Sequence, residues 1–238
     1  MIKGIFFDLG GTLFSYKNVT KTTFPILVDS IARTGASRDS EQIKSAYKEA
    51  SQEVAEGYSS KKYYLHKTFF EDVFKSFIER LKIDFDSALL SWYSDHHREK
   101  MLDCLEVKED CLSTLRRLKD KGIYLSIVSN IDDDMLIPLI DKGNLKPLID
   151  DAISSEQAQS CKPNRKIFEL ALLRAGIEAK DSLFVGDSPE HDISGASPLG
   201  FETVLILDGG LEPPLQVGKD TIPPNHTIKS LEELTTLV

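Results

Sequence analysis

Five short apolar runs, rich in residues that favour β-strands, constrain the fold of this 238-residue chain more than any other feature. They lie at 4–8, 123–129, 151–154, 182–187 and 201–207, and most are bounded by Gly, Asp or Ser. Because these runs are apolar on both faces, they predict strands buried between two layers. Helical patterns fill the intervals between the later runs, from about 110 to 121 and again after Pro163. The alternation predicts βαβ units, and therefore an α/β fold built on a parallel sheet.

Residues 17–102 differ from the rest, because their apolar positions recur at helical spacing almost throughout. Ten of the chain's twenty aromatic residues lie between Tyr58 and Tyr93, which is sufficient for a small separate core. We therefore expect a helical domain of residues 17–102, inserted after the first strand of a core domain that consists of residues 1–16 and 103–238. The alternative is that these helices pack directly on the sheet.

The chain after residue 207 begins with a Pro- and Gly-rich stretch, 208–226, which predicts a loop. The last residues, 230–238, have the pattern of a short amphipathic helix. We find neither an internal repeat nor a low-complexity tract.

The chain is acidic, with 38 Asp and Glu residues against 29 Lys and Arg residues and a formal net charge of −9. An acidic surface repels polyanions, so we expect no nucleic-acid partner. No run approaches the roughly eighteen apolar residues of a membrane helix, and Lys3 and Asp8 interrupt the N-terminal apolar run, which argues against a signal peptide.

The three cysteines, Cys104, Cys111 and Cys161, form no CxxC pair, and we expect them to be small core residues. We therefore expect a monomer or dimer of the reducing cytoplasm, with no membrane partner.

Chemically active side chains stand where three of the expected strands end. Asp8 ends the first run, Ser129 and Asn130 end the second, and Asp187 ends the fourth. In an open parallel sheet, ligands bind outside the carboxyl ends of the strands, where the strand order reverses. If the first strand is central, with the second and fourth beside it, these groups converge on one crevice. Lys162 can enter that crevice from the side.

This set of groups suits a phosphate held against a divalent cation. Two carboxylates aimed at one point repel each other unless a cation lies between them, and Mg²⁺ prefers oxygen ligands. Lys162 adds a positive charge, and Ser129 and Asn130 add neutral donors. Asp8 could then attack phosphorus, because the cation and the lysine offset the repulsion between two anions. Gly10–Gly11 allows a sharp turn whose N–H groups could face an anion.

Each feature also has a purely structural explanation. The glycines could form an ordinary turn, and Lys162 could be a solvated surface residue. Ser129-Asn130 and the Asp187-Ser188-Pro189 segment could cap helices. Their common placement at strand ends and helix starts favours a shared site instead.

Four segments resemble the motifs of the haloacid dehalogenase-like (HAD) hydrolase superfamily. FFDLGGTLF at 6–14 is similar to its first motif, and Ser129-Asn130 is similar to its second. CKP at 161–163 is similar to the lysine motif, and GDSPEHD at 186–192 to the acidic fourth motif. An insertion of this size between the first two motifs resembles the helical cap of the first subfamily. The resemblance thus implies a Rossmann-like core with an inserted α-helical cap that closes over the substrate and selects the leaving group.

The resemblance also implies an activity, that of a Mg²⁺-dependent phosphatase acting on a small phosphorylated metabolite. Asp8 and Lys162 would be catalytic, with an aspartyl-phosphate formed on Asp8. Mg²⁺ would be held by the side chains of Asp8 and Asp187 and by the carbonyl of Gly10, and Asp192 would support the metal's water shell or Lys162. The implied phosphate contacts are Gly11, Thr12, Ser129, Asn130 and Lys162.

One position departs from the superfamily pattern. The first motif normally carries a second Asp two residues after the nucleophile, and this chain has Gly10 there. A glycine still offers its carbonyl to Mg²⁺, but the general acid and base is lost, and such groups contribute roughly 10²–10⁴-fold. We therefore expect slowed or altered chemistry, with a rate that falls steeply as the leaving group becomes more basic, unless a His or Tyr of the helical segment serves as the acid.

Other functions remain open. The chain could be a catalytically impaired binding protein, or a dehalogenase, which also lacks the second Asp but needs no metal and so leaves Asp187 unexplained. It could be a phosphonate hydrolase, which would need a Schiff-base lysine. Candidates for that lysine are Lys61, Lys62 and Lys67, and candidates for substrate selection are Tyr16, Lys17, Tyr64 and His66. A phospho-acceptor signalling domain is disfavoured by the length of the chain and by the helical insertion.

Overall fold

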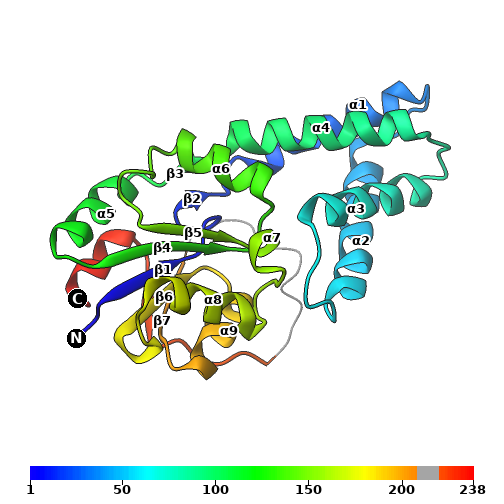
Figure 1. Ribbon diagram of the computed structural model, residues 1–238. Helices are drawn as coiled ribbons and strands as arrows, with labels where there is room; N and C mark the ends of the chain where they lie inside the picture. The colour runs from blue at the N-terminus through cyan, green and yellow to red at the C-terminus, as the bar shows by residue number, and fades with distance from the viewer. Residues whose placement is uncertain (208–219) are drawn as a thin grey trace.

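A parallel six-stranded sheet with the order β5-β4-β1-β6-β7-β8 organises the molecule, as the computed structural model shows (Figure 1). The structure describes residues 1–207 and 220–238. The strands are Gly4–Phe7 (β1), Tyr124–Ser129 (β4), Asp151–Ser154 (β5), Ser182–Gly186 (β6), Glu202–Ile206 (β7) and His226–Ile228 (β8). Strand β1 pairs with β4 on one side and with β6 on the other, and both pairings are parallel. The expected α/β fold is therefore confirmed, and the first strand meets the condition for convergence, because it is central with the second and fourth runs beside it.

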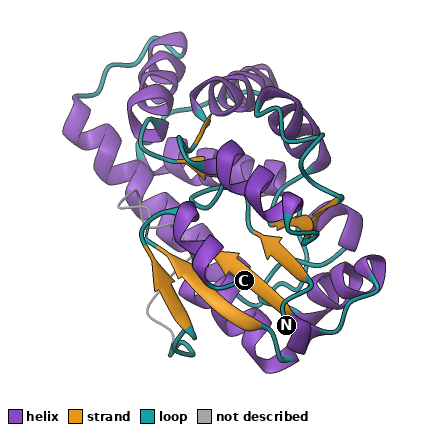
Figure 2. Ribbon diagram, turned by 90° about the vertical axis from the view of Figure 1, so that its left-hand side faces the viewer, coloured by secondary structure: helices purple, strands orange, loops and turns teal. Residues whose placement is uncertain are grey.

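Helices cover both faces of this sheet (Figure 2). Ile5 and Phe7 face a core formed with α5 (Cys111–Asp120), α6 (Asp133–Lys142) and the 3₁₀ helix η4 (Leu231–Thr236). Phe6 points the other way, into a core formed with α8 (Arg165–Ala175) and α9 (Ser194–Ala196). All three strand residues are completely buried, which explains why the runs in the sequence are apolar without alternation.

Four helices pack against one another at one end of the molecule, away from both termini (Figure 1). They are α1 (Val19–Arg33), α2 (Ser40–Tyr58), α3 (His66–Arg80) and α4 (Ser87–Cys104), and we call residues 19–104 the helical unit. Phe74 of α3 stacks on Tyr93 of α4, with ring centroids 3.9 Å apart, in a cluster separate from the cores on the sheet. Helix α4 continues two residues beyond position 102, the expected end of the helical segment.

The chain enters and leaves the helical unit through two short strands that pair with each other. Strand β2 (Phe14–Ser15) precedes α1, and β3 (Glu106–Val107) follows α4. They are antiparallel, with Phe14 opposite Val107 and Ser15 opposite Glu106. Strands of two residues show no periodicity in a sequence, so this pair was not predicted.

The C-terminal part also differs from expectation. Residues 226–228 form strand β8, which pairs with β7, although the loop predicted for 208–226 included His226. The expected final helix is the 3₁₀ helix η4, a tighter form that suits a short segment. Residues 208–219 of the predicted loop lie outside the described residues.

Two further expectations concern composition. Cys104, Cys111 and Cys161 are free and buried, as expected of small core residues. Among residues 1–207 and 220–238, no helix combines the length and the apolar character that a membrane span requires.

Phe184 provides a test of the second core. It is completely buried on β6, with its ring centroid 5.0 Å from that of Phe168 and 5.7 Å from that of Phe201. We expect Phe184→Ala to lower the free energy of unfolding by about 3–5 kcal/mol, because the truncation leaves a cavity. Leu173→Ala is the control, since Leu173 is 78% exposed on α8 and should change stability by no more than about 0.5 kcal/mol. Urea unfolding of both variants measures the difference.

Candidate active site

The three strand ends meet as the sequence analysis expected. Asp8 directly follows β1, Ser129 ends β4, and Asp187 directly follows β6. Ser129 Oγ donates a hydrogen bond of 2.9 Å to Oδ1 of Asp8, and Lys162 Nζ donates one of 2.6 Å to the same oxygen. Asp8 is buried, so these contacts lie in a region with little water. The register of β1 between β4 and β6 therefore assembles a carboxylate, a hydroxyl and an ammonium group at one point.

Lys162 is the buried cation at this point. Besides its bond to Asp8, Nζ donates to Oδ1 of Asp192 at 2.6 Å, and the Lys162 side chain is only 2% exposed. Burial would lower the pKa of Lys162, but the charges of Asp192 and Asp8 and the hydrogen bonds to both raise it above its ordinary value. Asn130 holds the Lys162 backbone, because its Oδ1 accepts from the Lys162 N–H at 2.7 Å and its Nδ2 donates to the Lys162 carbonyl at 3.0 Å. The lysine is thus fixed in place and charged.

Two glycines allow the acidic side chains to lie against the backbone. Gly11 has a φ of +74°, which L side chains rarely adopt, and a Cβ there would lie 2.1 Å from Oδ2 of Asp187. A Cβ on Gly186 would lie 2.2 Å from Cγ of Asp192. Any larger residue at either position would displace a carboxylate of the site.

The site carries more negative than positive charge. One carboxylate oxygen each from Asp8, Asp187 and Asp192 lies within 4.8 Å of the others. Lys162 pairs with Asp8 and Asp192, whereas Asp187 has no ion pair within the described part of the chain. Burial and the charges of Asp8 and Asp192 raise the pKa of Asp187 to about 8, and burial raises that of Asp192 to about 6 despite Lys162. A set of close carboxylates with one unbalanced member fits a hard divalent cation, which prefers such oxygen ligands.

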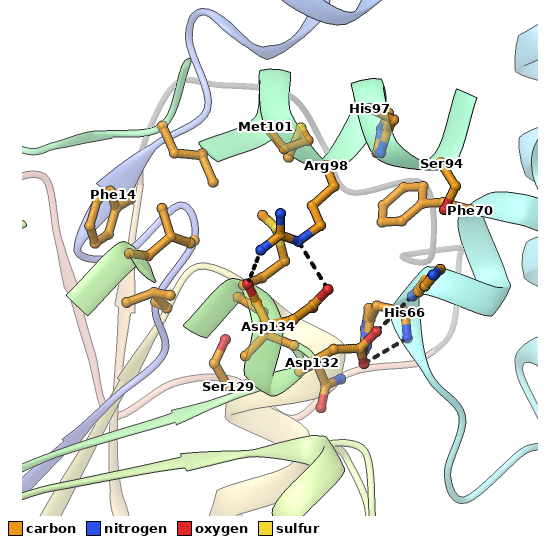
Figure 3. Close-up of a pocket in the computed structure, with 18 of the residues that line it drawn as sticks. Phe14, His66, Phe70, Ser94, His97, Arg98, Met101, Ser129, Asp132 and Asp134 are labelled. Carbon is orange, nitrogen blue, oxygen red and sulfur yellow. Dashed lines mark hydrogen bonds and ion pairs between the residues drawn. The ribbon is translucent and has the colours of Figure 1, made fainter. Parts of the chain in front are cut away.

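Two adjoining cavities open between the sheet and the helical unit. The larger, of about 440 Å³, is bordered by Asp8, Lys162 and Asp187 on the sheet side. The helical unit contributes to its wall Thr20 and Thr23 from α1, Lys44 and Lys48 from α2, His66 from α3 and His97 from α4. The smaller, of about 180 Å³, shares Ser129, His66 and His97 with the larger and is shown in Figure 3.

Asp132 joins the sheet side to the helical unit (Figure 3). It occupies the N-cap position of α6, yet its side chain does not cap that helix. Its two carboxylate oxygens accept instead from the backbone N–H groups of His66 and Lys67, at 2.9 and 2.7 Å, at the start of α3. Helix α3 has no capping side chain at its own N-cap residue, Leu65, so Asp132 satisfies these donors from across the interface. Burial would raise the pKa of Asp132, but these bonds and His66 lower it below its ordinary value.

A second contact lies beside it. Arg98 of α4 donates from Nε to Oδ2 of Asp134 at 3.0 Å and from a terminal nitrogen to the Asp134 carbonyl at 2.8 Å (Figure 3). Asp132 and Asp134 both lie shortly after Ser129, so one segment of chain bonds to Asp8 and to the helical unit.

Comparison with known proteins gives the family. A model of haloacid dehalogenase-like hydrolases matches residues 2–200, which is most of the chain. The chain belongs to the haloacid dehalogenase-like hydrolase family. The glyceraldehyde 3-phosphate phosphatase of Methanocaldococcus jannaschii is 27% identical to this HAD-like hydrolase over 241 residues, which cover 100% of this chain and 97% of that protein.

One further relative and one solved structure are also similar to this chain. The (S)-2-haloacid dehalogenase 4A of Burkholderia cepacia is 31% identical over 134 residues, which cover 56% of each chain. A magnesium-bound HAD hydrolase of Bacillus subtilis matches in structure with a TM-score of 0.78 at 20% identity, over 99% of this chain and 98% of that one. The structural match shows the fold that this HAD-like hydrolase shares with it.

The remaining residues singled out in the sequence fall into two groups. The first group lines one or both cavities and consists of Gly10, Tyr16, His66 and Lys67. The second group lines neither cavity and consists of Gly11, Thr12, Lys17, Lys61, Lys62 and Tyr64. The N–H of Gly11 donates to the Phe14 carbonyl at 2.7 Å, so it does not face an anion as expected. Thr12 is completely buried, and its hydroxyl has no hydrogen-bond partner within the described residues.

Three features of this HAD-like hydrolase were not found from its sequence. They are the contact of Asp132 with α3, the ion pair of Arg98 with Asp134, and the bonding of Asn130 to the Lys162 backbone. Asp132 carried a signal, because an acidic residue before an apolar helical run indicates an N-cap. That signal predicts that Asp132 caps its own helix, α6. It cannot show that Asp132 instead caps α3.

We expect His97 to make the stability of this HAD-like hydrolase depend on pH. Its ring lies among aromatic residues, 4.6 Å from that of Phe70, and burial lowers its pKa to about 4. Between that value and the unfolded pKa of about 6.5, the unfolded chain binds more protons, so stability is lost as the pH falls. We expect a loss of about 2 kcal/mol through this group between about pH 7.5 and pH 5. Urea unfolding at both values should show a smaller loss for His97→Gln, and equal losses would contradict the assignment.

Proposed function

We propose that this HAD-like hydrolase is a Mg²⁺-dependent phosphatase of a small phosphorylated metabolite. The observation that carries the proposal is the arrangement at the strand ends. A buried Asp8 is held by Ser129 and Lys162, next to an Asp187 that has no cationic partner among residues 1–207 and 220–238, and both carboxylates border a cavity of about 440 Å³. That volume suits a small molecule. The full-length similarity to a protein named glyceraldehyde 3-phosphate phosphatase supports phosphate as the group removed.

The donor set fits Mg²⁺. The residues that would hold it are Asp8 and Asp187 through their carboxylates and Gly10 through its carbonyl, with Asp192 behind them on Lys162. When bound, the cation would offset the negative charge that accumulates when a phosphate approaches these carboxylates. The raised pKa of Asp187 is consistent with a site that lacks one positive charge.

Each protein group then has a role. Asp8 attacks phosphorus, a bond forms between its carboxylate oxygen and phosphorus, and the bond from phosphorus to the leaving oxygen breaks. Lys162 and Ser129 hold the phosphoryl group at the point where they now hold Asp8. Asn130 fixes the Lys162 backbone, so we assign it a positioning role in addition to the phosphate contact suggested by the sequence. Water then attacks the aspartyl-phosphate, which releases phosphate and restores Asp8.

We further propose that residues 17–102 are a cap domain and that residues 1–16 and 103–238 are the core domain. The separate cluster of aromatic side chains supports this division, and so does the paired entry and exit at β2 and β3. The cap would select the substrate through the residues of α1–α4 that line the larger cavity. Closure would be held by the bonds of Asp132 to α3, because they cross the interface.

The buried cysteines and the net charge support a proposal for the cellular setting. We propose a cytoplasmic protein, because three buried free thiols suit a reducing compartment. We propose small phosphorylated molecules as its partners, with no nucleic acid and no membrane, since its net charge of −9 repels polyanions. The protein would act as a monomer or a dimer.

A dehalogenase is the second candidate, because Gly10 leaves no carboxyl group to protonate a leaving group and a halide needs no proton. The (S)-2-haloacid dehalogenase 4A matches only 56% of the chain. A dehalogenase would also have no use for Asp187 beside Asp8 without a cation. Release of halide from 2-chloropropionate in the absence of Mg²⁺ would favour this candidate over a phosphatase.

The roles of the two aspartates can be separated. We expect Asp8→Asn to lower the turnover of 4-nitrophenyl phosphate by roughly 10³-fold or more, because an amide is a poor nucleophile. Asp187→Asn should retain activity but need a higher Mg²⁺ concentration for half-maximal rate, since it loses only a ligand charge. Initial rates against Mg²⁺ concentration measure both effects, and Asp29→Asn, an exposed carboxylate on α1, is the control. Near wild-type turnover in Asp8→Asn would contradict the covalent mechanism.

The contact between Asp132 and α3 can be tested for closure. Asp132→Ala removes the acceptor of two backbone N–H groups, which costs about 1–2 kcal/mol in the closed state. We therefore expect KM for a phosphate ester to rise roughly 5- to 30-fold. Hydrogen exchange should also rise at 15–17 and 101–105, where the helical unit joins the sheet. In wild type, Mg²⁺ with a phosphate analogue should lower exchange at the same junctions.

Asp39→Ala is the matched control for Asp132→Ala. Asp39 caps α2 within the helical unit and accepts from the N–H groups of Glu41 and Gln42, at 3.0 and 2.9 Å. It lines neither cavity, so its loss should lower stability by about 1 kcal/mol without changing KM. An equal rise in KM for both variants would show that Asp132 only stabilises a helix.

A further inference from the structure

Tyr16 occupies the space into which a side chain at position 10 would project. A Cβ atom on Gly10 would lie 2.0 Å from the phenol oxygen of Tyr16 and 2.5 Å from its Cζ. The preceding turn brings the chain back to this point, because Leu13 and Phe14 both donate their N–H groups to the Leu9 carbonyl, at 2.8 and 2.9 Å. The hydroxyl of Tyr16 therefore lies beside the position, two residues after Asp8, at which the chain has no side chain.

Tyr16 also borders the space in which a substrate would react. Its side chain lines the larger cavity together with Asp8 and Lys162, and it lines the smaller cavity together with Gly10. In phosphoryl transfer, the attacking oxygen and the leaving oxygen lie roughly in line on opposite sides of phosphorus. The leaving oxygen of an ester attacked by Asp8 would thus lie in the cavity that Tyr16 borders.

We propose that the Tyr16 hydroxyl donates a proton to the leaving oxygen. It would thus act as the general acid, a role that Gly10 cannot fill because it has no side chain. The inference rests on the proposed phosphatase function and assigns a residue to its first step. As the bond from phosphorus to the leaving oxygen breaks, the phenol O–H bond also breaks, so the leaving group departs as a neutral alcohol and Tyr16 becomes a phenolate. When water attacks the aspartyl-phosphate, the phenolate takes one proton from that water, and the phenol is restored.

The histidines that line the larger cavity suit this role less well. Burial lowers the pKa of both His97 and His191 to about 4, so both lack the acidic imidazolium proton at neutral pH. The Nδ1 atom of His66 lies 3.7 Å from Oδ1 of Asp132, at the contact between α3 and the sheet side. A phenol ordinarily keeps its proton at neutral pH and can give it up to a developing alkoxide.

The test compares kcat/KM for phosphate monoesters whose leaving groups range from 4-nitrophenol to ethanol, using the full chain with Mg²⁺. Wild type should show a shallow dependence on leaving-group pKa, instead of the steep one expected without an acid. Tyr16→Phe keeps the ring and removes the hydroxyl, so it should lose roughly 10²–10⁴-fold on ethyl phosphate. On 4-nitrophenyl phosphate, whose leaving group needs no proton, it should lose less than about threefold. Calorimetric binding of inorganic phosphate should not change.

Two further sets of variants make the result specific. Tyr47→Phe removes a phenol hydroxyl from another tyrosine of the larger cavity, and it should change kcat/KM by one common factor for all esters. Tyr16→Ala empties the space beside position 10, and adding Gly10→Asp to it should recover roughly tenfold or more on ethyl phosphate. Gly10→Asp alone should give no such gain, because its Cβ would meet the phenol oxygen.

Equal losses on all esters in Tyr16→Phe would overturn the proposal, and so would a leaving-group-dependent loss that appears in Tyr47→Phe instead. Failure of the phosphatase function itself gives a different result. In that case wild type hydrolyses none of the esters, and neither Asp8→Asn nor Tyr16→Phe changes the background rate.

Discussion

The site depends on the two ion pairs that the ammonium group of Lys162 makes. This group lies between the carboxylates of Asp8 and Asp192, 2.6 Å from each, and all three groups are almost without solvent. A buried carboxylate is costly unless a cation compensates it, so Lys162 allows the ends of β1 and of the segment after β6 to carry charge in the interior. It cannot serve a third carboxylate as well. The remaining imbalance at Asp187 is a reason to propose a further cation at this site.

Five of the six strands of the sheet could be predicted because the sheet obeys simple rules. Buried parallel strands are apolar on both faces, and their carboxyl ends lie at one edge, so Asp8, Ser129 and Asp187 had to converge once β1 was central. The position of Lys162 followed less directly, since it lies in a loop before α8. Its place just before a helix start put it at the side of the crevice, and the resemblance to a known family added its role there.

Other features depend on contacts that a sequence pattern does not encode. Strands β2, β3 and β8 have two or three residues each, which is too short for an alternation to be recognised. Asp132 has the sequence signature of a cap for its own helix, yet its side chain bonds to a helix 65 and 66 residues away in the sequence. The approach of Tyr16 to Gly10 likewise results from the turn between them, whose geometry the residue types alone do not specify.

The antiparallel pair of β2 and β3 places the two ends of the helical unit side by side. A segment whose ends are neighbours can be lengthened, shortened or replaced without moving the strands to which it is attached. If the helical unit selects the substrate as proposed, its residues can change independently of Asp8, Ser129 and Lys162. Such a chain would be modular, because one continuous stretch of sequence could be exchanged to accept new molecules while the groups at the sheet edge stayed the same.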